Sequence, residues 1–222
     1  MNTPSREVPI DPAHAALLIV DVQNYCAHPD GAASRKLDAR QRDYLFSSLR
    51  GTVLPNLQLL QSACRRARIE IVYAAVENMT RDGRDRSLDY KISGIDVPRG
   101  SWDAQVLDEI APAEDEMIFR KTSSSVFIST NIDYVLRNLQ VRSLIVAGLM
   151  TDQCVESAVR DACDLGYLVT LVTDACTTKS AERHEQSLLG IRGYCRQRPS
   201  AVILTELAVA PAPALPPGNS TN

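Results

Sequence analysis

The sequence lacks the features that mark several common classes of protein. No apolar run approaches the roughly 20 residues that a membrane-spanning helix requires. Lysine and arginine form no concentrated stripe, and the formal net charge is −3, so we do not expect nucleic acid as the main partner. No Cys-x-x-Cys pair and no cysteine–histidine cluster with zinc spacing is present, so we expect neither a metal nor another cofactor. Small molecules remain as the expected partners.

Histidine is scarce, and the six cysteines are scattered rather than paired. The chain begins Met-Asn-Thr-Pro-Ser-Arg-Glu and has no apolar signal segment. Scattered cysteines without a secretory signal are typical of reduced thiols, so we expect a cytoplasmic protein. The six are Cys26, Cys64, Cys154, Cys163, Cys176 and Cys195.

Strand-like and helix-like segments alternate along the chain, a pattern typical of parallel strands joined by right-handed helical crossovers. We predict one three-layer α/β/α doubly wound domain over residues 1–207, followed by a disordered tail rich in proline and alanine over 208–222. Strands are predicted over 16–22, 69–76, 116–120, 141–147, 167–172 and 201–204. Helices are predicted over 41–68 with a bend near Pro55, 103–110, 131–139, the segment that contains Cys154, and 181–192.

One cysteine lies where a predicted strand passes into a helix. The apolar strand ends at Gly148, and Cys154 falls in the first turn of the helix that follows. Thr151 or Asp152 can cap that helix, and Gly166 can terminate it. Unpaired amides and the dipole at a helix N-terminus favour thiolate over thiol. We therefore predict that Cys154 is a nucleophile with a lowered pKa.

Two charged residues follow other predicted strands. Asp21 comes directly after the apolar run Leu17-Leu-Ile-Val20 of the first strand, where a buried carboxylate needs a partner or a raised pKa. Lys121 follows the strand predicted over 116–120. Because chemistry collects at the carboxyl ends of parallel strands, we expect Asp21, Lys121 and Cys154 to lie together. Asp21 can then accept the thiol proton, and Lys121 can hold the carboxylate in place. The backbone amides of Met150 and Cys154 can bind the oxyanion.

At these residues the chain resembles the isochorismatase-like cysteine hydrolases, a superfamily that includes nicotinamidases, N-carbamoylsarcosine amidohydrolases and ureidoacrylate amidohydrolases. The resemblance covers roughly residues 15–207. It implies a six-stranded, mainly parallel sheet in the order 3-2-1-4-5-6, an Asp-Lys-Cys triad, a cis peptide bond between Leu149 and Met150, and a homodimer or homotetramer. It rests on Leu18-Ile-Val-Asp21-Val-Gln23, on Lys121 followed by Ser125 and Phe127, and on Gly148-Leu-Met-Thr-Asp-Gln-Cys154-Val155.

One departure from the family pattern narrows the expected activity. Nicotinamidases follow the second strand with Asp-x-His and a further histidine that bind a divalent metal, whereas here no histidine lies between Glu77 and His184. The resemblance therefore implies cleavage of a C–N bond in a small linear amide or ureido compound, through a thioester on Cys154. Ether hydrolysis of the isochorismatase type and a non-catalytic binding protein on the same scaffold are the alternatives.

The remaining candidates surround this site. Residues 77–101 form a charged connection that is long for a compact domain, and such connections are often lids. His184 lies on a polar helix face and is expected to be exposed, His28 is expected to be a solvated loop residue, and Cys26 is expected to be structural. The expected substrate contacts are Gln23, Tyr25, Glu77, Trp102 and Phe127.

Overall fold

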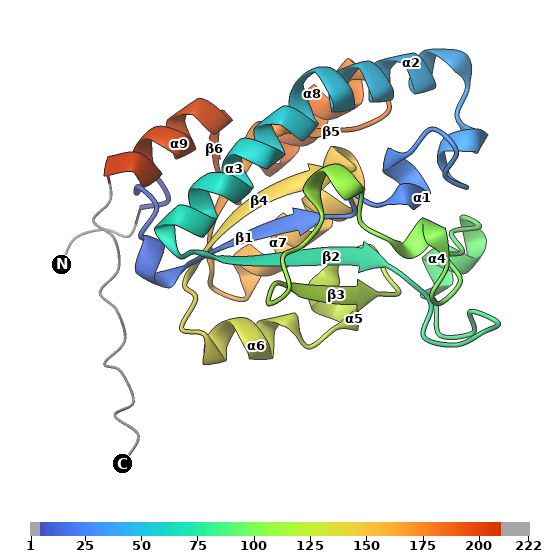
Figure 1. Ribbon diagram of the computed structural model, residues 1–222, viewed down its shortest axis with the longest axis horizontal. Helices are drawn as coiled ribbons and strands as arrows, with labels where there is room; N and C mark the ends of the chain where they lie inside the picture. The colour runs from blue at the N-terminus through green and yellow to red at the C-terminus, as the bar shows by residue number, and fades with distance from the viewer. Residues whose placement is uncertain (1–4, 210–222) are drawn as a thin grey trace.

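The computed structural model describes residues 5–209, and these residues form a six-stranded sheet. All neighbouring strands run parallel, in the order β3-β2-β1-β4-β5-β6 (Figure 1). The predicted doubly wound α/β fold and its strand order are therefore confirmed. The strands are β1 (Ala15–Val20), β2 (Glu70–Val76), β3 (Met117–Lys121), β4 (Ser143–Leu149), β5 (Leu168–Thr177) and β6 (Arg196–Arg198).

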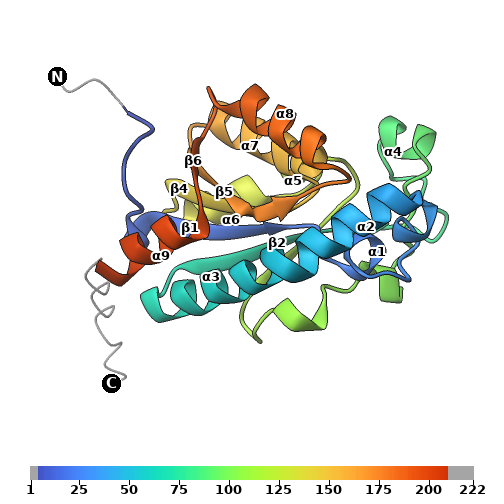
Figure 2. The ribbon, with the colours of Figure 1, turned by 90° about the horizontal axis from the view of Figure 1, so that it is seen from above.

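Helices cover both faces of the sheet. Helix α3 (Leu54–Ala67) packs with α9 (Ser200–Val209) on one face, and α7 (Glu156–Asp164) packs with α8 (Ala181–Ile191) on the other (Figure 2). Every residue of β1 is buried because the sheet is covered on both sides, which explains its continuous apolar sequence. The remaining helices are α1 (Asn24–Ala27), α2 (Ala39–Ser48), α4 (Leu88–Ile92), α5 (Val126–Ser129) and α6 (Ile132–Asn138).

A long helical run leads toward β2 and begins two residues earlier than its sequence pattern indicates. Asp38 starts the run with a capping box, in which its side chain and that of Gln41 each accept a hydrogen bond from the other residue's backbone N–H. Helix α2 continues into α3 through a π-helical turn, Leu49–Val53. This turn precedes Pro55, which has no N–H to donate to the carbonyl four residues before it. The irregularity predicted at the proline therefore lies in the turn before it.

The prediction of a last strand over 201–204 is wrong. These residues belong to α9, and the edge strand is β6, whose sequence Arg-Gln-Arg has no apolar signal. The carboxylate of Asp174 accepts hydrogen bonds from the Ser200 backbone N–H at 2.6 Å and from its hydroxyl at 2.9 Å, at the start of α9. A short apolar run suits a buried helix as well as a strand, and this distant cap stabilises the helix.

The helix predicted over 103–110 is also wrong. Two 3₁₀ turns, Trp102–Ala104 and Asp108–Ile110, flank Val106, which forms an antiparallel bridge with Gln23. This pairing draws the segment into an extended conformation between the turns. Helix α9 reaches two residues into the predicted tail, and the rest of that tail, 210–222, lies outside the described residues. Within residues 5–209, none of the helices is long and apolar enough to cross a membrane.

Candidate active site

The three predicted catalytic residues lie at the carboxyl ends of three parallel strands. Asp21 follows the last residue of β1, Lys121 is the last residue of β3, and Cys154 lies in the turn after β4. Asp21 has a φ of 52°, a left-handed conformation that is rare outside glycine. Its backbone N–H donates to the Ala74 carbonyl at 2.8 Å, which ties the residue to β2.

The side chains of Asp21, Lys121 and Cys154 meet in one buried cluster. Lys121 Nζ lies 2.9 Å from Asp21 Oδ2 and 3.3 Å from Cys154 Sγ. Lys121 is 0% exposed, Asp21 is 3% exposed and Cys154 is 9% exposed, so water screens these charges weakly. The arrangement places a carboxylate, an ammonium group and a thiol in mutual contact at the carboxyl edge of the sheet.

The turn that carries Cys154 is π-helical, Thr151–Val155, and it passes directly into α7. The peptide bond between Leu149 and Met150 is cis, at the position that the family pattern implies. Gly148 precedes it with a φ of 123°, and a Cβ there would lie 2.2 Å from the Val20 carbonyl oxygen of β1. A glycine is therefore required for β4 to lie against β1 at this point.

The predicted side-chain caps of this helical run are wrong, whereas its predicted end is confirmed. Thr151 Oγ1 pairs with His184 Nδ1 at 2.8 Å, and Asp152 accepts hydrogen bonds from Thr178 and Arg183. Neither side chain therefore satisfies the first backbone amides of the run. At the other end, Gly166 follows the C-cap with a φ of 94°, as expected of a glycine that terminates a helix.

The pKa of the Cys154 thiol is raised, contrary to the sequence-based expectation. Burial and the neighbouring Asp21 carboxylate raise this pKa to about 12, against the opposing effect of the Lys121 ammonium. Burial likewise raises the pKa of Asp21, although Lys121 opposes the shift. Burial acts to lower the pKa of Lys121, but Asp21 and Cys154 outweigh it and raise that pKa well above its ordinary value. The resting site therefore holds a thiol, which needs a base before it can attack.

Tyr90 is a fourth member of the cluster that the sequence did not reveal. It lies on α4, within the long connection 77–101, and it is 1% exposed. Its hydroxyl accepts a hydrogen bond from Lys121 Nζ at 3.0 Å and lies 3.7 Å from Cys154 Sγ. The sequence offers no signal for this contact, because a tyrosine in a charged loop has no periodicity that predicts where it packs.

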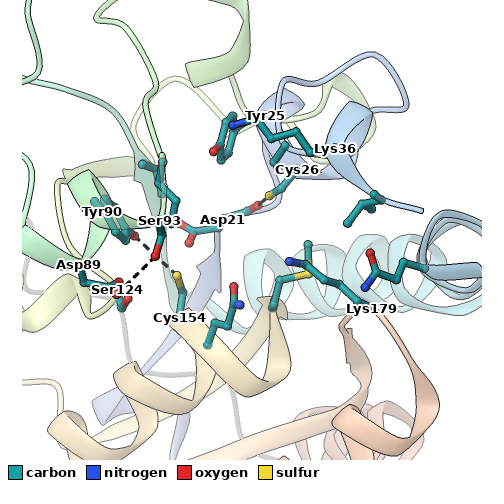
Figure 3. A pocket seen from close by; sticks show the side chains of 17 residues that line it. Asp21, Tyr25, Cys26, Lys36, Asp89, Tyr90, Ser93, Ser124, Cys154 and Lys179 are labelled. Atoms are coloured by element: carbon teal, nitrogen blue, oxygen red, sulfur yellow. Dashed lines mark hydrogen bonds between the residues drawn. The ribbon is translucent and has the colours of Figure 1, made fainter. Parts of the chain in front are cut away.

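A cavity of about 540 Å³ gives access to the cluster. Asp21, Tyr90, Met150 and Cys154 line it, so both residues predicted to supply oxyanion amides face the same space. Figure 3 shows the side chains of Asp21, Tyr90 and Cys154 turned toward one another, with Lys36 and Lys179 across the cavity. The cavity can therefore bring the carbonyl of a small molecule to the thiol.

Only one of the five residues predicted to contact substrate lines the cavity. Tyr25 lines the cavity, but the other four do not. Gln23 is fully buried and bonds with its side chain to the Val76 backbone of β2, so it holds the sheet edge. Glu77 pairs with Arg120 at 2.9 Å and accepts a hydrogen bond from the Gly100 backbone N–H.

The two aromatic candidates that do not line the cavity pack elsewhere. Trp102 is 46% exposed and makes an edge contact with the ring of His28, while Phe127 packs against Tyr167. Both were expected to contact substrate, but neither ring lines the cavity. Both rings therefore have packing roles in this structure.

His184 departs from expectation, whereas Cys26 has the structural role expected of it. His184 is half-buried through its contact with Thr151, so the prediction of an exposed side chain is wrong. Cys26 lines the cavity, and its thiol donates to the Asp21 carbonyl at 3.0 Å. Burial raises the pKa of Cys26 strongly, which leaves it a neutral packing and hydrogen-bonding group. Over residues 5–209, no group of three or more His, Cys, Asp or Glu side chains is placed to hold a metal ion.

The strand order and the helical layers define an isochorismatase-like α/β protein. Residues 15–206 match the isochorismatase domain family, and the chain belongs to this family of hydrolases. A cysteine hydrolase from Pseudomonas syringae pv. phaseolicola 1448A superposes with a TM-score of 0.79 at 25% identity, over 94% of this chain and 99% of that one.

Amidohydrolases are among the similar proteins. The ureidoacrylate amidohydrolase RutB of Agrobacterium fabrum (strain C58 / ATCC 33970) is 30% identical over 196 residues, which are 79% of this chain and 82% of that protein. The fold is also that of N-carbamoylsarcosine amidase from Thermoplasma acidophilum, with a TM-score of 0.67 at 22% identity, over 84% of this chain and 96% of that one.

Proposed function

We propose that this protein is an amidohydrolase that cleaves a C–N bond of a small linear amide or ureido compound. The observation that carries the proposal is the buried contact of Asp21, Lys121 and Cys154 beside a cavity of about 540 Å³. A thiol that meets both a base and a cation has the groups that nucleophilic attack on a carbonyl requires. The similarity to an amidohydrolase at 30% identity supports the same reaction class.

Asp21 acts as the base and then as the acid. Its Oδ2 pairs with Lys121, while its Oδ1 is buried and has no hydrogen-bond partner among the described residues. A free, buried carboxylate oxygen is a strong acceptor, and Asp21 lies near enough for it and the Cys154 thiol to shift each other's pKa. Asp21 takes the thiol proton as sulfur forms a bond to the carbonyl carbon, and it returns that proton to the leaving nitrogen.

The C–N bond then breaks, and ammonia or an amine leaves a thioester on Cys154. Water attacks the thioester and gives a proton to Asp21. The C–S bond then breaks, the acyl group leaves as a carboxylic or carbamic acid, and Asp21 returns the proton to the sulfur. Lys121 balances the negative charge that moves between Asp21 and Cys154 in both steps. The backbone amides of Met150 and Cys154 bind the carbonyl oxygen as it becomes negative.

We propose a substrate that carries a carboxylate at the end remote from the scissile bond. Lys36 and Lys179 both line the cavity, and within residues 5–209 neither pairs with a carboxylate. Asp21 and Asp89 are the acidic side chains of the lining, and Asp21 is paired with Lys121, so the ammonium groups of Lys36 and Lys179 outnumber the one remaining carboxylate. A ureido acid or a carbamoyl amino acid has this chemistry. Ureidoacrylate, which gives the relative from Agrobacterium fabrum its name, is one such compound.

The test is release of ammonia from a panel of ureido acids, carbamoyl amino acids and primary amides, including nicotinamide. We expect turnover by the wild type and by Cys163→Ala, which replaces a half-buried cysteine outside the cavity lining, and no turnover by Cys154→Ala. Equal ammonia release by Cys154→Ala would contradict the mechanism. Release of pyruvate from isochorismate without activity on any amide would indicate ether hydrolysis, and silence on all compounds would indicate a binding protein.

A further inference from the structure

The ammonium group of Lys121 has more neighbours than protons. Its Nζ lies 2.9 Å from Asp21 Oδ2, 3.0 Å from Tyr90 Oη, 3.1 Å from the Ser123 carbonyl oxygen and 3.3 Å from Cys154 Sγ. An ammonium group has three N–H donors and no acceptor. The neutral thiol is the weakest acceptor of the four, so the three oxygens satisfy Lys121 in the resting site.

This arrangement fixes the direction of the Tyr90 hydroxyl. Because Lys121 only donates, Tyr90 Oη accepts from it, and the Tyr90 proton is left to point elsewhere. Among the residues that the structure describes, the other hydrogen-bonding neighbour of Oη is Cys154 Sγ, at 3.7 Å (Figure 3). Tyr90 is 1% exposed, so water hardly competes for that proton. The Tyr90 O–H is therefore directed at the sulfur.

We propose that Tyr90 is a catalytic residue that stabilises the Cys154 thiolate by donating its hydroxyl proton to the sulfur. This inference rests on the proposed function, in which Asp21 removes the thiol proton. When the sulfur becomes negative, it receives one hydrogen bond from Tyr90 and competes for another from Lys121. Hydrogen bonds to an ionised group are stronger than those to a neutral one, so Tyr90 favours the thiolate over the thiol.

The connection 77–101 is built to hold Tyr90 at this position. The Ser87 side chain caps α4 by accepting from the Tyr90 backbone N–H at 3.2 Å, and the Ser87 backbone N–H donates to the Thr122 carbonyl at 2.9 Å. Thr122 directly follows Lys121, so the segment is tied to the strand end that carries the lysine. Arg86 closes the loop by donating to the Ile95 carbonyl at 2.8 Å. The segment predicted as a lid thus supplies a group that contacts the reacting sulfur.

The test compares the alkylation of Cys154 by iodoacetamide in the wild type and in Tyr90→Phe, as a function of pH and with the modified cysteine located by mass spectrometry. This measurement needs no substrate, so it stays informative even if the proposed amide hydrolysis fails. Loss of one hydrogen bond to a charged group is expected to lower the thiolate fraction at least tenfold. A thiolate whose thiol has a higher pKa is about threefold more nucleophilic for each unit of pKa, and this partly offsets the loss of thiolate. The observed alkylation rate is therefore expected to fall about threefold or more. The midpoint of the alkylation rate against pH is expected to move to higher pH.

Tyr134→Phe is the matched control, because Tyr134 is 68% exposed on α6, and its alkylation profile is expected to equal that of the wild type. With a substrate in hand, kcat/KM of Tyr90→Phe is expected to fall about tenfold or more without a matching loss of thermal stability. An unchanged alkylation rate and pH profile in folded Tyr90→Phe would overturn the proposal. If that variant does not fold, Tyr90→His, which keeps a donor, is compared with Tyr90→Leu, and equal rates in this pair would overturn it instead.

Discussion

Replacing Lys121 by methionine is expected to destabilise the protein more than any substitution of a surface lysine. Lys121 is 0% exposed and lies 2.9 Å from Asp21 Oδ2, and Oδ1 already has no hydrogen-bond partner within residues 5–209. Methionine keeps most of the side-chain volume but leaves the carboxylate buried without its ion pair. Breaking a buried pair in this way costs about 3–5 kcal/mol of unfolding free energy.

The size of this loss depends on pH through Asp21. Burial raises the pKa of Asp21 above its ordinary 3.8, and removal of the Lys121 ammonium raises it further. Above the folded-state pKa the carboxylate is charged in both states, so the full penalty is present. As the pH falls from the folded-state pKa toward the unfolded-state pKa, the folded protein binds the proton first, and the penalty disappears. The destabilisation is therefore expected to be smaller at about pH 5 than at about pH 8.

Urea unfolding of a double-mutant cycle measures the effect. Lys121→Met combined with Asp21→Asn removes both charges, and it is expected to recover most of the stability that Lys121→Met loses. Lys91→Met, at an exposed lysine of α4, is the control and is expected to change stability by no more than about 0.5 kcal/mol. A loss below about 1 kcal/mol for Lys121→Met at neutral pH, or no recovery in the double variant, would refute the reasoning.

Three further predictions follow from the same geometry. Gly148→Ala is expected to lower the unfolding free energy by about 3 kcal/mol or more, because its Cβ would lie 2.2 Å from the Val20 carbonyl oxygen. Gly51→Ala is the control, because its Cβ would meet nothing within 4 Å, and it is expected to be neutral or up to about 1 kcal/mol stabilising. Equal melting temperatures for Gly148→Ala and Gly51→Ala would contradict this prediction. Lys179→Ala is expected to raise KM about tenfold for a carboxylate-bearing substrate and to leave uncharged amides unaffected, and an equal effect on both would exclude an anion-binding role. In reducing buffer, the Cys154 thiol is expected to lower the unfolding free energy by about 1.4 kcal/mol per pH unit between pH 9 and 12, because its pKa is raised to about 12 and the folded state keeps a proton that the unfolded state releases. A flat stability profile over that range would contradict the raised pKa.

The sequence predicts the triad because its signals are local and the sheet brings them together. An acid directly after an apolar strand, a lysine at a strand end and a cysteine in a strand–turn–helix segment each have a recognisable position. The rule that ligands bind at the carboxyl ends of parallel strands then places them at one edge. Asp21, Lys121 and Cys154 are in contact there, although their catalytic roles, the homo-oligomer and the cytoplasmic location remain predictions.

What the sequence could not supply depends on contacts between distant segments. The polar strand β6 carries Arg196, which is 3% exposed and pairs with Glu206 of α9 at 2.8 Å, a contact that no local pattern reveals. The prediction of a thiolate at Cys154 rested only on the helix terminus, whereas burial and the Asp21 carboxylate raise the pKa of this thiol. Tyr90 reaches the site through the long connection 77–101, whose course depends on its own hydrogen bonds.

The most direct test of the account is mass spectrometry of the protein quenched with acid during turnover of an amide substrate. The account predicts a mass increase equal to the acyl part of the substrate, located on the peptide that contains Cys154 and absent from Cys154→Ala. An adduct on another cysteine, or undiminished turnover by Cys154→Ala, would contradict the assignment of Cys154 as the nucleophile.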